Sequence, residues 1–425
     1  MHQINRRHGM RLAVAGWLGS ILVAAAGEAN YQPFVVGERA AGMGGAVAAT
    51  ADGMDACFYN PAGLGGEARD SISVNGTLYG IQNFETEDAA FPGEDFEVSS
   101  FMTIPTGLSA VKKLKAGTVA AFSVFVPSAS SAREILAFQD QRHYYNYSQD
   151  EQTLYLGPSI GHVLNDRLSL GASVFGVYQT ASVFQNLYWG DYAYTYTANY
   201  KYSVIGVVGT LGAQYKLADE WSAGLALSTP SATLSGNGSI QISEVLGDEN
   251  ASGAAAIYYE DLDADNGLPA MARAGIGWRR VGVASAGIDA THHFSSAFDW
   301  MDGVQDGEAV VIRQKRRAVT DVQVGGEYVF RKRFPVRAGF FTSLSSAPDL
   351  DPEEASSPNQ IDLYGATASV GSIGENVVLN LGLSYVWGSG DAYGTRLDES
   401  GALETVVTGT TESGLYAFAS TTYRF

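Results

Sequence analysis

Residues Val377–Trp387 read VVLNLGLSYVW, and every second side chain from Val377 onward is apolar. Asn380, Gly382 and Ser384 lie between these apolar residues. A period of two is typical of a β-strand that has one apolar face and one polar face. The stretch therefore predicts a strand, and its apolar face ends in two aromatic rings.

The same alternation recurs along the chain after residue 70. It is clearest at 71–78, 221–228, 272–278 and 322–330. Several of these apolar faces end in Trp, Tyr or Phe, the residues that gather at membrane–water interfaces. In a soluble sandwich the apolar face would form the core, whereas in a membrane barrel it would face lipid. The alternation by itself leaves both folds open.

The connections between the strands separate these two folds. We expect fourteen strands, at roughly 71–82, 99–111, 117–127, 151–163, 168–182, 199–217, 219–230, 269–279, 282–293, 319–330, 335–343, 361–373, 376–388 and 413–425. Their links alternate between long ones, at 83–98, 128–150, 183–198, 231–268, 294–318, 344–360 and 389–412, and short ones, at 112–116, 164–167, 218, 280–281, 331–334 and 373–375. Long loops at one end, short turns at the other and an even strand number are typical of an outer-membrane barrel. The predicted fold is therefore all-β: a 14-stranded antiparallel transmembrane β-barrel over residues 71–425.

The first residues indicate export. Arg6, Arg7 and Arg11 precede an apolar run of 15 residues, 12–26, which is followed by small residues. This order is typical of a cleaved secretory signal peptide, which we place at residues 1–29. An uncleaved anchor is the alternative, but a helix of this length is shorter than a hydrocarbon core about 30 Å thick. We therefore expect a protein of the outer membrane.

Composition excludes several classes of function. The 425 residues carry a formal net charge of −19 and a single cysteine. One cysteine allows neither a disulfide framework nor a multi-cysteine metal site, and an acidic chain lacks the basic stripe of a nucleic-acid-binding protein. His162, His292 and His293 have no partners at metal-ligand spacing, and we find no nucleophile–base arrangement. We expect no metal, no cofactor, no nucleic-acid partner and no enzymatic activity.

Residues 30–70 follow a different pattern, rich in small residues and without strand periodicity. A compact segment of this kind at the start of a barrel can fill the lumen as a plug, or hatch. We expect Asn60 and Pro61 to start a turn there, and Gly63 to allow a left-handed conformation. The characteristic residues of this hatch are Gly42, Gly44, Gly45, Asn60, Pro61, Ala62 and Gly63. They do not form a phosphate-binding loop, because the downstream Gly-Lys-Ser/Thr is missing.

Two further groups are candidate site residues. Charged residues on the polar faces of predicted strands, which would point into the lumen, are Arg273, Asp289, Glu327 and Arg337. Of these, Arg273 and Asp289 lie on neighbouring strands and are expected to form an ion pair. Residues of the second and third long loops form a candidate surface for substrate capture: Tyr144, Tyr145, Tyr147, Phe184, Leu187, Tyr188 and Trp189. An aromatic girdle, or packing within the loops, is the alternative for this second group.

Five stretches resemble the FadL/TodX family of outer-membrane transport proteins. GERAAGMGGA at 37–46, ADG at 51–53 and YNPAGL at 59–64 are similar to the N-terminal hatch of that family. LPAMARAGIG at 268–277, with GIDA at 287–290, resembles its eighth and ninth strands. The terminal Phe425, with Tyr423 on the same face, is similar to the signal that the bacterial barrel assembly machinery reads.

The resemblance implies a hatch-gated barrel that moves hydrophobic compounds, such as long-chain fatty acids, inward. External loops would capture the ligand, a pocket beside the hatch would hold it, and an opening in the wall would release it sideways. No pocket residues follow from the sequence, and no bulge signature in the third strand, 117–127, marks the opening.

We therefore expect passive uptake of a hydrophobic small molecule. The expected partners are outer-membrane lipid around the barrel and, through Phe425, the assembly machinery. Two alternatives stay open at this point. One is a general porin for polar solutes, and the other is a non-transporting barrel that docks another envelope protein.

Overall fold

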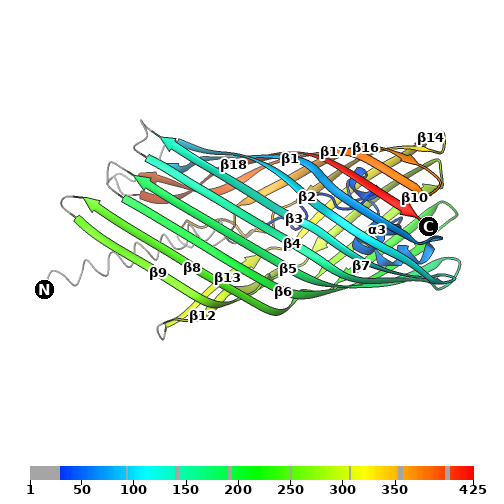
Figure 1. Cartoon of the computed structure of the whole chain (residues 1–425), viewed down its shortest axis with the longest axis horizontal. Helices are drawn as coiled ribbons and strands as arrows, with labels where there is room; N and C mark the ends of the chain where they lie inside the picture. Colours follow the sequence, from blue (N-terminus) through cyan, green and yellow to red (C-terminus); the bar gives the residue numbers. More distant parts are fainter. Residues whose placement is uncertain are drawn as a thin grey trace.

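A computed structural model describes residues 29–91, 94–138, 143–189, 194–248, 251–305, 308–352, 358–397 and 403–425. The predicted signal peptide therefore lies almost entirely outside the described residues. The described chain is an antiparallel β-barrel with long strands, drawn from blue to red in Figure 1.

Fourteen strands form the wall of the barrel. They are β1 (Ser71–Phe91), β2 (Glu94–Lys115), β3 (Thr118–Phe138), β4 (His143–Val163), β5 (Leu168–Trp189), β6 (Tyr194–Lys216), β7 (Trp221–Ser228), β10 (Met271–Arg280), β11 (Ala284–His293), β14 (Val319–Phe330), β15 (Phe334–Ser343), β16 (Gln360–Ile373), β17 (Val377–Leu397) and β18 (Leu403–Arg424). Each pairs with the next, and β1 pairs with β18 from Ser71 opposite Arg424 onward. This last ladder closes the ring, so the predicted strand number and the antiparallel order are confirmed.

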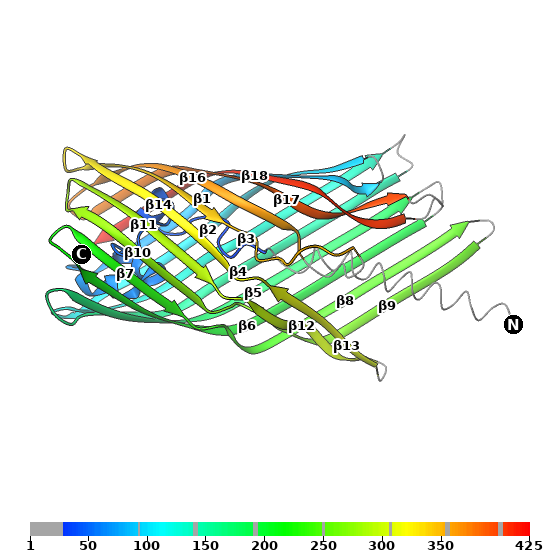
Figure 2. The same cartoon turned by 180° about the vertical axis from the view of Figure 1, so that it is seen from behind.

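Two further hairpins extend the wall at one end. One is formed by β8 (Ala232–Asp248) and β9 (Ala251–Ala264), and the other by β12 (Ser296–Gln305) and β13 (Glu308–Arg316). Strand β8 continues the sheet beside the outer half of β6, and β9 meets β12 at Ala264 and Met301. Figure 2 shows both hairpins reaching beyond the barrel rim.

The predicted long loops are mostly strand, and this expectation was wrong in detail. β1 and β2 continue the ladder through most of 83–98, and β3 to β6 do the same through 128–150 and 183–198. A strand of 21 residues at about 3.3 Å per residue is ~70 Å long, more than twice a hydrocarbon core of about 30 Å. The ladder continues because pairing satisfies backbone groups in water as well as in lipid. The short turns lie where they were predicted, as at 164–167 and 331–333.

The apolar faces of the strands point outward. Leu379, Leu381 and Leu383 of β17 are 50–59% exposed, whereas Asn380 and Ser384 are 1% and 5% exposed. A soluble sandwich would show the reverse, so this polarity identifies the outer surface as the lipid-facing one. Rings cluster on the same surface, with Tyr385 and Trp387 stacked at 5.5 Å and Tyr364 at 6.3 Å from Trp387.

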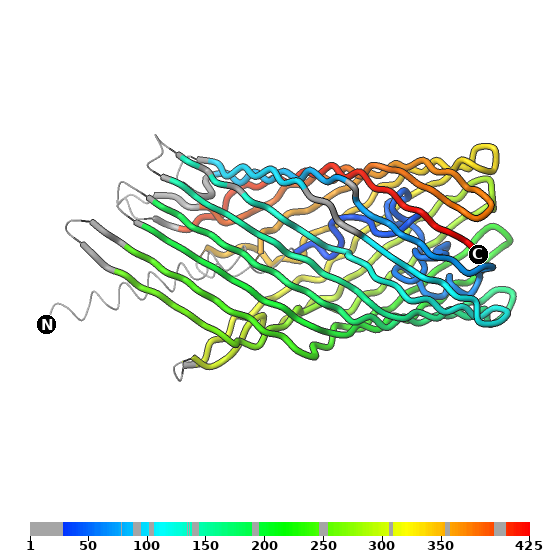
Figure 3. Tube along the Cα trace, in the orientation of Figure 1, coloured from blue at the N-terminus to red at the C-terminus, as the bar shows by residue number. Residues whose placement is uncertain are grey.

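The N-terminal segment, defined here as residues 29–70, lies inside the barrel. It contains α2 (Arg39–Gly42), α3 (Gly53–Tyr59) and the 3-10 helix η1 (Pro61–Gly66). Figure 3 shows it in dark blue within the wall, near the end where the chain terminates. Ala40, Met43 and Leu64 are fully buried there. Among the described residues, no helix combines the length and the apolar content needed to cross a bilayer.

Candidate functional site

A ring of wall glycines holds the N-terminal segment against the barrel. At seven inward-facing glycines an added Cβ would come within 3.1 Å of backbone atoms of the segment: Gly161, Gly171, Gly212, Gly224, Gly287, Gly325 and Gly339. At Gly325, for example, it would lie 2.1 Å from the carbonyl oxygen of Met43. Several of them are ladder partners on adjacent strands, as Gly287 with Gly325 and Gly325 with Gly339. We call this ring the glycine belt; side chains at these positions would hold the segment away from the wall.

The glycine belt was not predicted from the sequence. The predicted glycine positions lay within the segment alone, although 50 glycines occur in the chain. The available signal was glycine at inward-facing positions of successive strands. It could not be used because neighbouring strands must first be placed in register.

The glycines of the predicted hatch also contact the wall. Gly44 has a φ of +62°, which favours glycine, and an added Cβ would meet the backbone of Phe340. Its N–H donates to Thr367 Oγ1, which donates in turn to the carbonyl of Gly42. Gly45 also has a positive φ, of +83°. Gly63 does not, so the predicted left-handed conformation is wrong; glycine is needed there because the carbonyl oxygen of Ala51 would lie 2.0 Å from a Cβ.

Asn60 joins helices α3 and η1 of the segment to each other and to the wall. Its side chain is fully buried and donates to the carbonyl oxygens of Ala48, at 2.8 Å, and Ala213, at 3.0 Å. Its Oδ1 accepts from the N–H of Ala62, and Pro61 occupies the first turn of η1. The predicted turn start is thus also a contact with strand β6.

Two carboxylates of the segment have opposite electrostatic environments. Burial alone would raise the pKa of Asp52, but the charges of Arg279, 2.6 Å away, and of Arg39 outweigh it and lower that pKa. Burial raises the pKa of Asp55 to about 7, and the charge of Glu38 adds to this effect. Asp55 accepts from the backbone N–H groups of residues 38–40, so it fixes the start of α2 from within α3.

The four predicted lumen charges all lie on the inner side of the wall. Arg337 and Glu327 form an ion pair at 2.7 Å. Arg273 and Asp289 do not pair directly, which corrects our expectation: Asp289 Oδ2 accepts from the N–H of Ala48, and the Arg273 guanidinium lies 4.8 Å from the centre of the Tyr59 ring. The N-terminal segment, which the strand pattern could not place, takes both side chains as partners.

An apolar cavity of about 710 Å³ lies above the N-terminal segment. Nine of its 15 lining residues are aromatic or aliphatic, including Phe58 of α3 and Tyr155, Phe175, Val208, Leu268 and Met271 of the wall and its loops. The other six are polar or charged: Gln32, Thr210, Ser228, Thr229, Arg273 and His293. Phe58 lies 6.3 Å from Tyr155, and Tyr155 lies 6.1 Å from Phe175, between ring centres. A concave and mainly apolar lining suits a small hydrophobic molecule.

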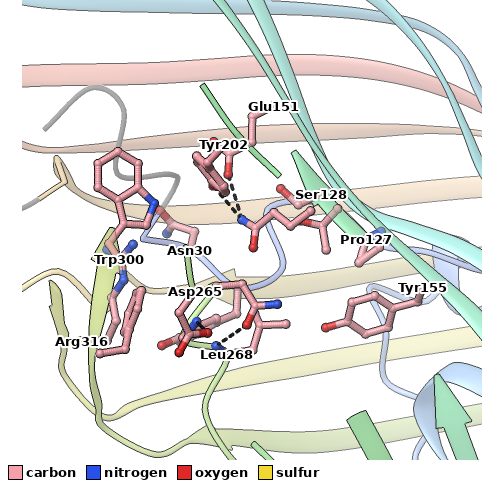
Figure 4. Close-up of a pocket in the computed structure, with 16 residues that line it drawn as sticks. Asn30, Pro127, Ser128, Glu151, Tyr155, Tyr202, Asp265, Leu268, Trp300 and Arg316 are labelled. Carbon is pink, nitrogen blue, oxygen red and sulfur yellow. Dashed lines mark hydrogen bonds between the residues drawn. The ribbon is translucent and has the colours of Figure 1, made fainter. Parts of the chain in front are cut away.

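A second, more polar cavity of about 650 Å³ adjoins the first. The two share Tyr31, Pro127, Tyr155 and Leu268 in their linings. Figure 4 shows Glu151, Tyr202, Trp300 and Arg316 around the polar cavity, with Tyr155 at the side that leads to the apolar one. The amide nitrogen of Gln179 donates to Glu151 at 3.3 Å and to the Tyr202 hydroxyl at 3.1 Å.

The wall is interrupted beside both cavities. Among the described residues, β2 and β3 pair only where Gly107–Lys115 lies opposite Thr118–Phe125. Before residue 107, β2 pairs with β1 alone, and after residue 125, β3 pairs with β4 alone. Between Phe125 and Ser128, β3 has one residue more than the opposing stretch of β4 between Tyr155 and Thr153, which is a β-bulge. Pro127, which has no N–H to donate, lies in this bulge and lines both cavities.

The predicted capture residues lie on strands and not in loops. Tyr144, Tyr145 and Tyr147 belong to β4, opposite Tyr188, Leu187 and Gln185 of β5. The strand period divides the group: Tyr145, Tyr147 and Leu187 join an inner cluster with Tyr200, Tyr202 and Trp300. Tyr144 and Tyr188 stack on the other face at 5.3 Å, where Phe184 also points. Trp189 ends β5, and its side chain lies outside the described part of the chain.

Metal ligands do not gather anywhere in the described part of the chain: no group of three or more His, Cys, Asp or Glu side chains is placed to hold an ion. His293 stacks instead on Tyr31 at 4.3 Å, and His162 contacts the hydroxyl of Thr118.

The fold and the site define a closed transmembrane barrel with an interior segment and adjoining cavities. Solved structures of this architecture are known. A FadL homologue of Pseudomonas aeruginosa matches with a TM-score of 0.67 and 16% identity, over 93% of this chain and 100% of that one. The toluene transporter TbuX of Ralstonia pickettii matches with a TM-score of 0.62 and 18% identity, over 92% and 98%. The Pseudomonas putida toluene transporter TodX matches with 0.63 and 14%, over 95% and 98%.

The chain therefore has the fold of the FadL and TodX channels, as the sequence resemblance implied. No protein-family model matches it, and no curated protein sequence matches it.

Proposed function

We propose that this protein is an outer-membrane channel for the passive uptake of hydrophobic compounds, and that it has no enzymatic activity. One observation carries the proposal: an apolar cavity lies between a lumen filled by the N-terminal segment and an interrupted ladder in the wall. A hydrophobic molecule gains roughly 25 cal/mol for each Å² of apolar surface that leaves water, so such a cavity concentrates it. The neighbouring folds of a FadL homologue and of two toluene transporters support the same function.

The path begins at the outer end of the barrel. Capture takes place at this end of β4 and β5, on the inward-facing Tyr145, Tyr147 and Leu187 and on the outward-facing Tyr144, Phe184 and Tyr188, with Trp189 at the end of β5. The ligand then passes the inner aromatic cluster, reaches the two cavities, and leaves sideways at Pro127 into the membrane. Residues 30–70 act as the hatch that keeps polar solutes from passing, with Gly42, Gly44, Gly45 and Asn60–Gly63 at the wall.

The remaining expectations fit this function. The signal peptide, residues 1–29, directs the chain to export and is then cleaved, Phe425 serves recognition by the assembly machinery, and outer-membrane lipid surrounds the apolar face. A general porin would need a continuous aqueous lumen, which the packing of the N-terminal segment opposes. A non-transporting docking barrel would have no use for an apolar cavity beside the wall.

Deletion of Pro127 tests sideways release. It removes the extra residue of β3, so β3 can run regularly and extend its ladder with β2. We expect uptake of radiolabelled toluene and oleate by cells carrying the deletion variant to fall about tenfold below uptake with the intact protein. The control is Pro127→Ala, which keeps the chain length and hence the bulge, and should transport normally.

Equal transport by the deletion variant and by Pro127→Ala would contradict sideways release. If the intact protein takes up none of toluene, oleate and decanol faster than cells without it, the proposed function is wrong.

A further inference from the structure

We propose that the cargo is an uncharged amphipathic molecule, with an apolar body in the apolar cavity and a hydroxyl group in the polar cavity. The inference rests on the proposed function and narrows its substrate class: alkanols and phenols are favoured over plain hydrocarbons and over fatty-acid anions. The adjoining linings of the two cavities carry this inference, because they differ in chemistry and share four residues.

Hydrogen-bonding atoms of the polar cavity lack partners within the protein. The carboxamide oxygen of Gln179 is buried and unpaired, although its nitrogen is fully used by Glu151 and Tyr202. The amide nitrogen of Asn266 is buried and unpaired as well, although its oxygen accepts from the N–H of Leu268. Gln179 therefore offers an acceptor and Asn266 a donor.

A hydroxyl group can satisfy either atom, because it both donates and accepts. A hydrocarbon can satisfy neither, and would leave two buried polar atoms without hydrogen bonds. The polar cavity therefore discriminates between ligands that carry a hydroxyl and ligands of the same length that do not.

The polar cavity is lined by two carboxylates and one guanidinium. Glu151 and Arg316 both line it, each is 8% exposed, and the charge of Glu151 acts on Arg316. Asp265 is a further carboxylate in the same lining. An anionic head group would face two carboxylates and one guanidinium, so it gains no net attraction to offset its desolvation. An ammonium group would compete with Arg316 for Glu151.

The test compares four ligands of equal chain length: decane, decanol, decanoate and decylamine. The protein is reconstituted in nanodiscs, and each radiolabelled compound is equilibrated with protein-containing and with empty nanodiscs. The ratio of the two uptakes removes each compound's own preference for lipid. We expect this ratio to be about tenfold higher for decanol than for decane, the size of one buried hydrogen bond left unmade. Decanoate and decylamine should also bind less than decanol.

Two variants assign the effect to the polar cavity. Gln179→Leu keeps the approximate side-chain size and removes the acceptor, together with the hydrogen bonds that the amide nitrogen donates to Glu151 and Tyr202. Asn266→Ala removes the donor without touching strand β5. Each should reduce the decanol ratio toward that of decane while the decane ratio stays unchanged. The matched control is Tyr178→Leu, the residue next to Gln179 on the outer, lipid-facing side of the same strand, where it is 44% exposed.

The outcomes separate this inference from the proposed function. If decane binds as well as decanol, or if decanoate or decylamine binds best, the inference is wrong while the proposed function stands. Equal losses of decane and decanol binding in both variants would also overturn the inference, because Gln179 and Asn266 would then have only a structural role. If no compound exceeds its uptake by empty nanodiscs, the proposed function itself fails.

Discussion

Asp55 shows how one side chain fixes the N-terminal segment. Its carboxylate oxygens lie 2.6–3.0 Å from three backbone nitrogens at the start of α2, although Asp55 itself belongs to α3. The sequence pattern marked Asn60 and Pro61 as a turn but assigned no role to Asp55. Such a role depends on two helices that are separated by a loop, and no local pattern reports it.

The stability of the segment should depend on the ionisation of Asp55. Burial raises its pKa from an ordinary 3.8 to about 7 in the packed segment. Between these two values the packed form therefore holds a proton on Asp55 that the released form has lost. The stability gained in this way is fully present below pH 3.8 and is lost as the pH rises through about 7. We expect amide protection of residues 38–40, corrected for the intrinsic exchange rate, to fall over this interval.

The matched substitutions are Asp55→Asn, which should abolish the pH dependence, and Glu375→Gln in an exposed turn, which should leave it unchanged. A constant protection from pH 4 to pH 7 in the unmodified protein would contradict the assignment to Asp55.

The two faces of the wall strands differ in composition. Their outward positions are apolar and specify a surface for lipid, as in Val377–Trp387 of β17. Their inward positions are small where the N-terminal segment approaches, which produces the glycine belt. The apolar outward face repeats within one strand and was predicted. The glycine belt is spread over seven strands and was not predicted.

Neighbouring glycines of β14 offer a test of the glycine belt. Gly325→Val would place a side chain against the Met43 carbonyl, which lies 2.1 Å from an added Cβ, whereas a Cβ at Gly326 has its nearest neighbour at 3.7 Å. Overpacking of this kind costs about 1–3 kcal/mol, so the segment should leave the wall more often. The single cysteine, Cys57 of α3, is 1% exposed and reports on this event.

We expect a maleimide to label Cys57 about tenfold faster in Gly325→Val than in the unmodified protein. Gly326→Val should leave the labelling rate unchanged. Equal rates in the two variants would show that the glycine belt does not hold the segment.

The whole molecule combines a closed wall with an interior segment. The β1–β18 ladder closes the ring of wall strands, and the described β2–β3 ladder is interrupted beyond Gly107 and Phe125. Around the segment, the lumen side of the wall carries the glycine belt and polar side chains, and the segment meets it with both backbone and side-chain hydrogen bonds, as between Ala48 and Asp289. The segment is therefore part of the packed structure of the barrel.

Deletion of residues 30–66 should open the lumen. We expect planar-bilayer conductance of the deletion variant to rise to that of an open pore, because the removed residues fill the cross-section that the glycine belt surrounds. Retention of a folded barrel is checked by its strand signal in circular dichroism. A conductance equal to that of the intact protein would rule out the plug.

The sequence alone determined the barrel, its strand number, its short turns and the presence of an interior segment, because local patterns predict each of them. Alternation of period two predicts the strands, the short links between them predict the turns, and a glycine-rich stretch without strand periodicity predicts the segment. Only the tertiary structure decided the partners of Arg273 and Asp289, the glycine belt, the bulge at Pro127 and the two cavities. These features join residues far apart in the chain, such as Asn60 with Ala213, and depend on strand register and on the position of the segment within the lumen. A periodic pattern states which face of a strand a residue occupies, but not what lies opposite that face.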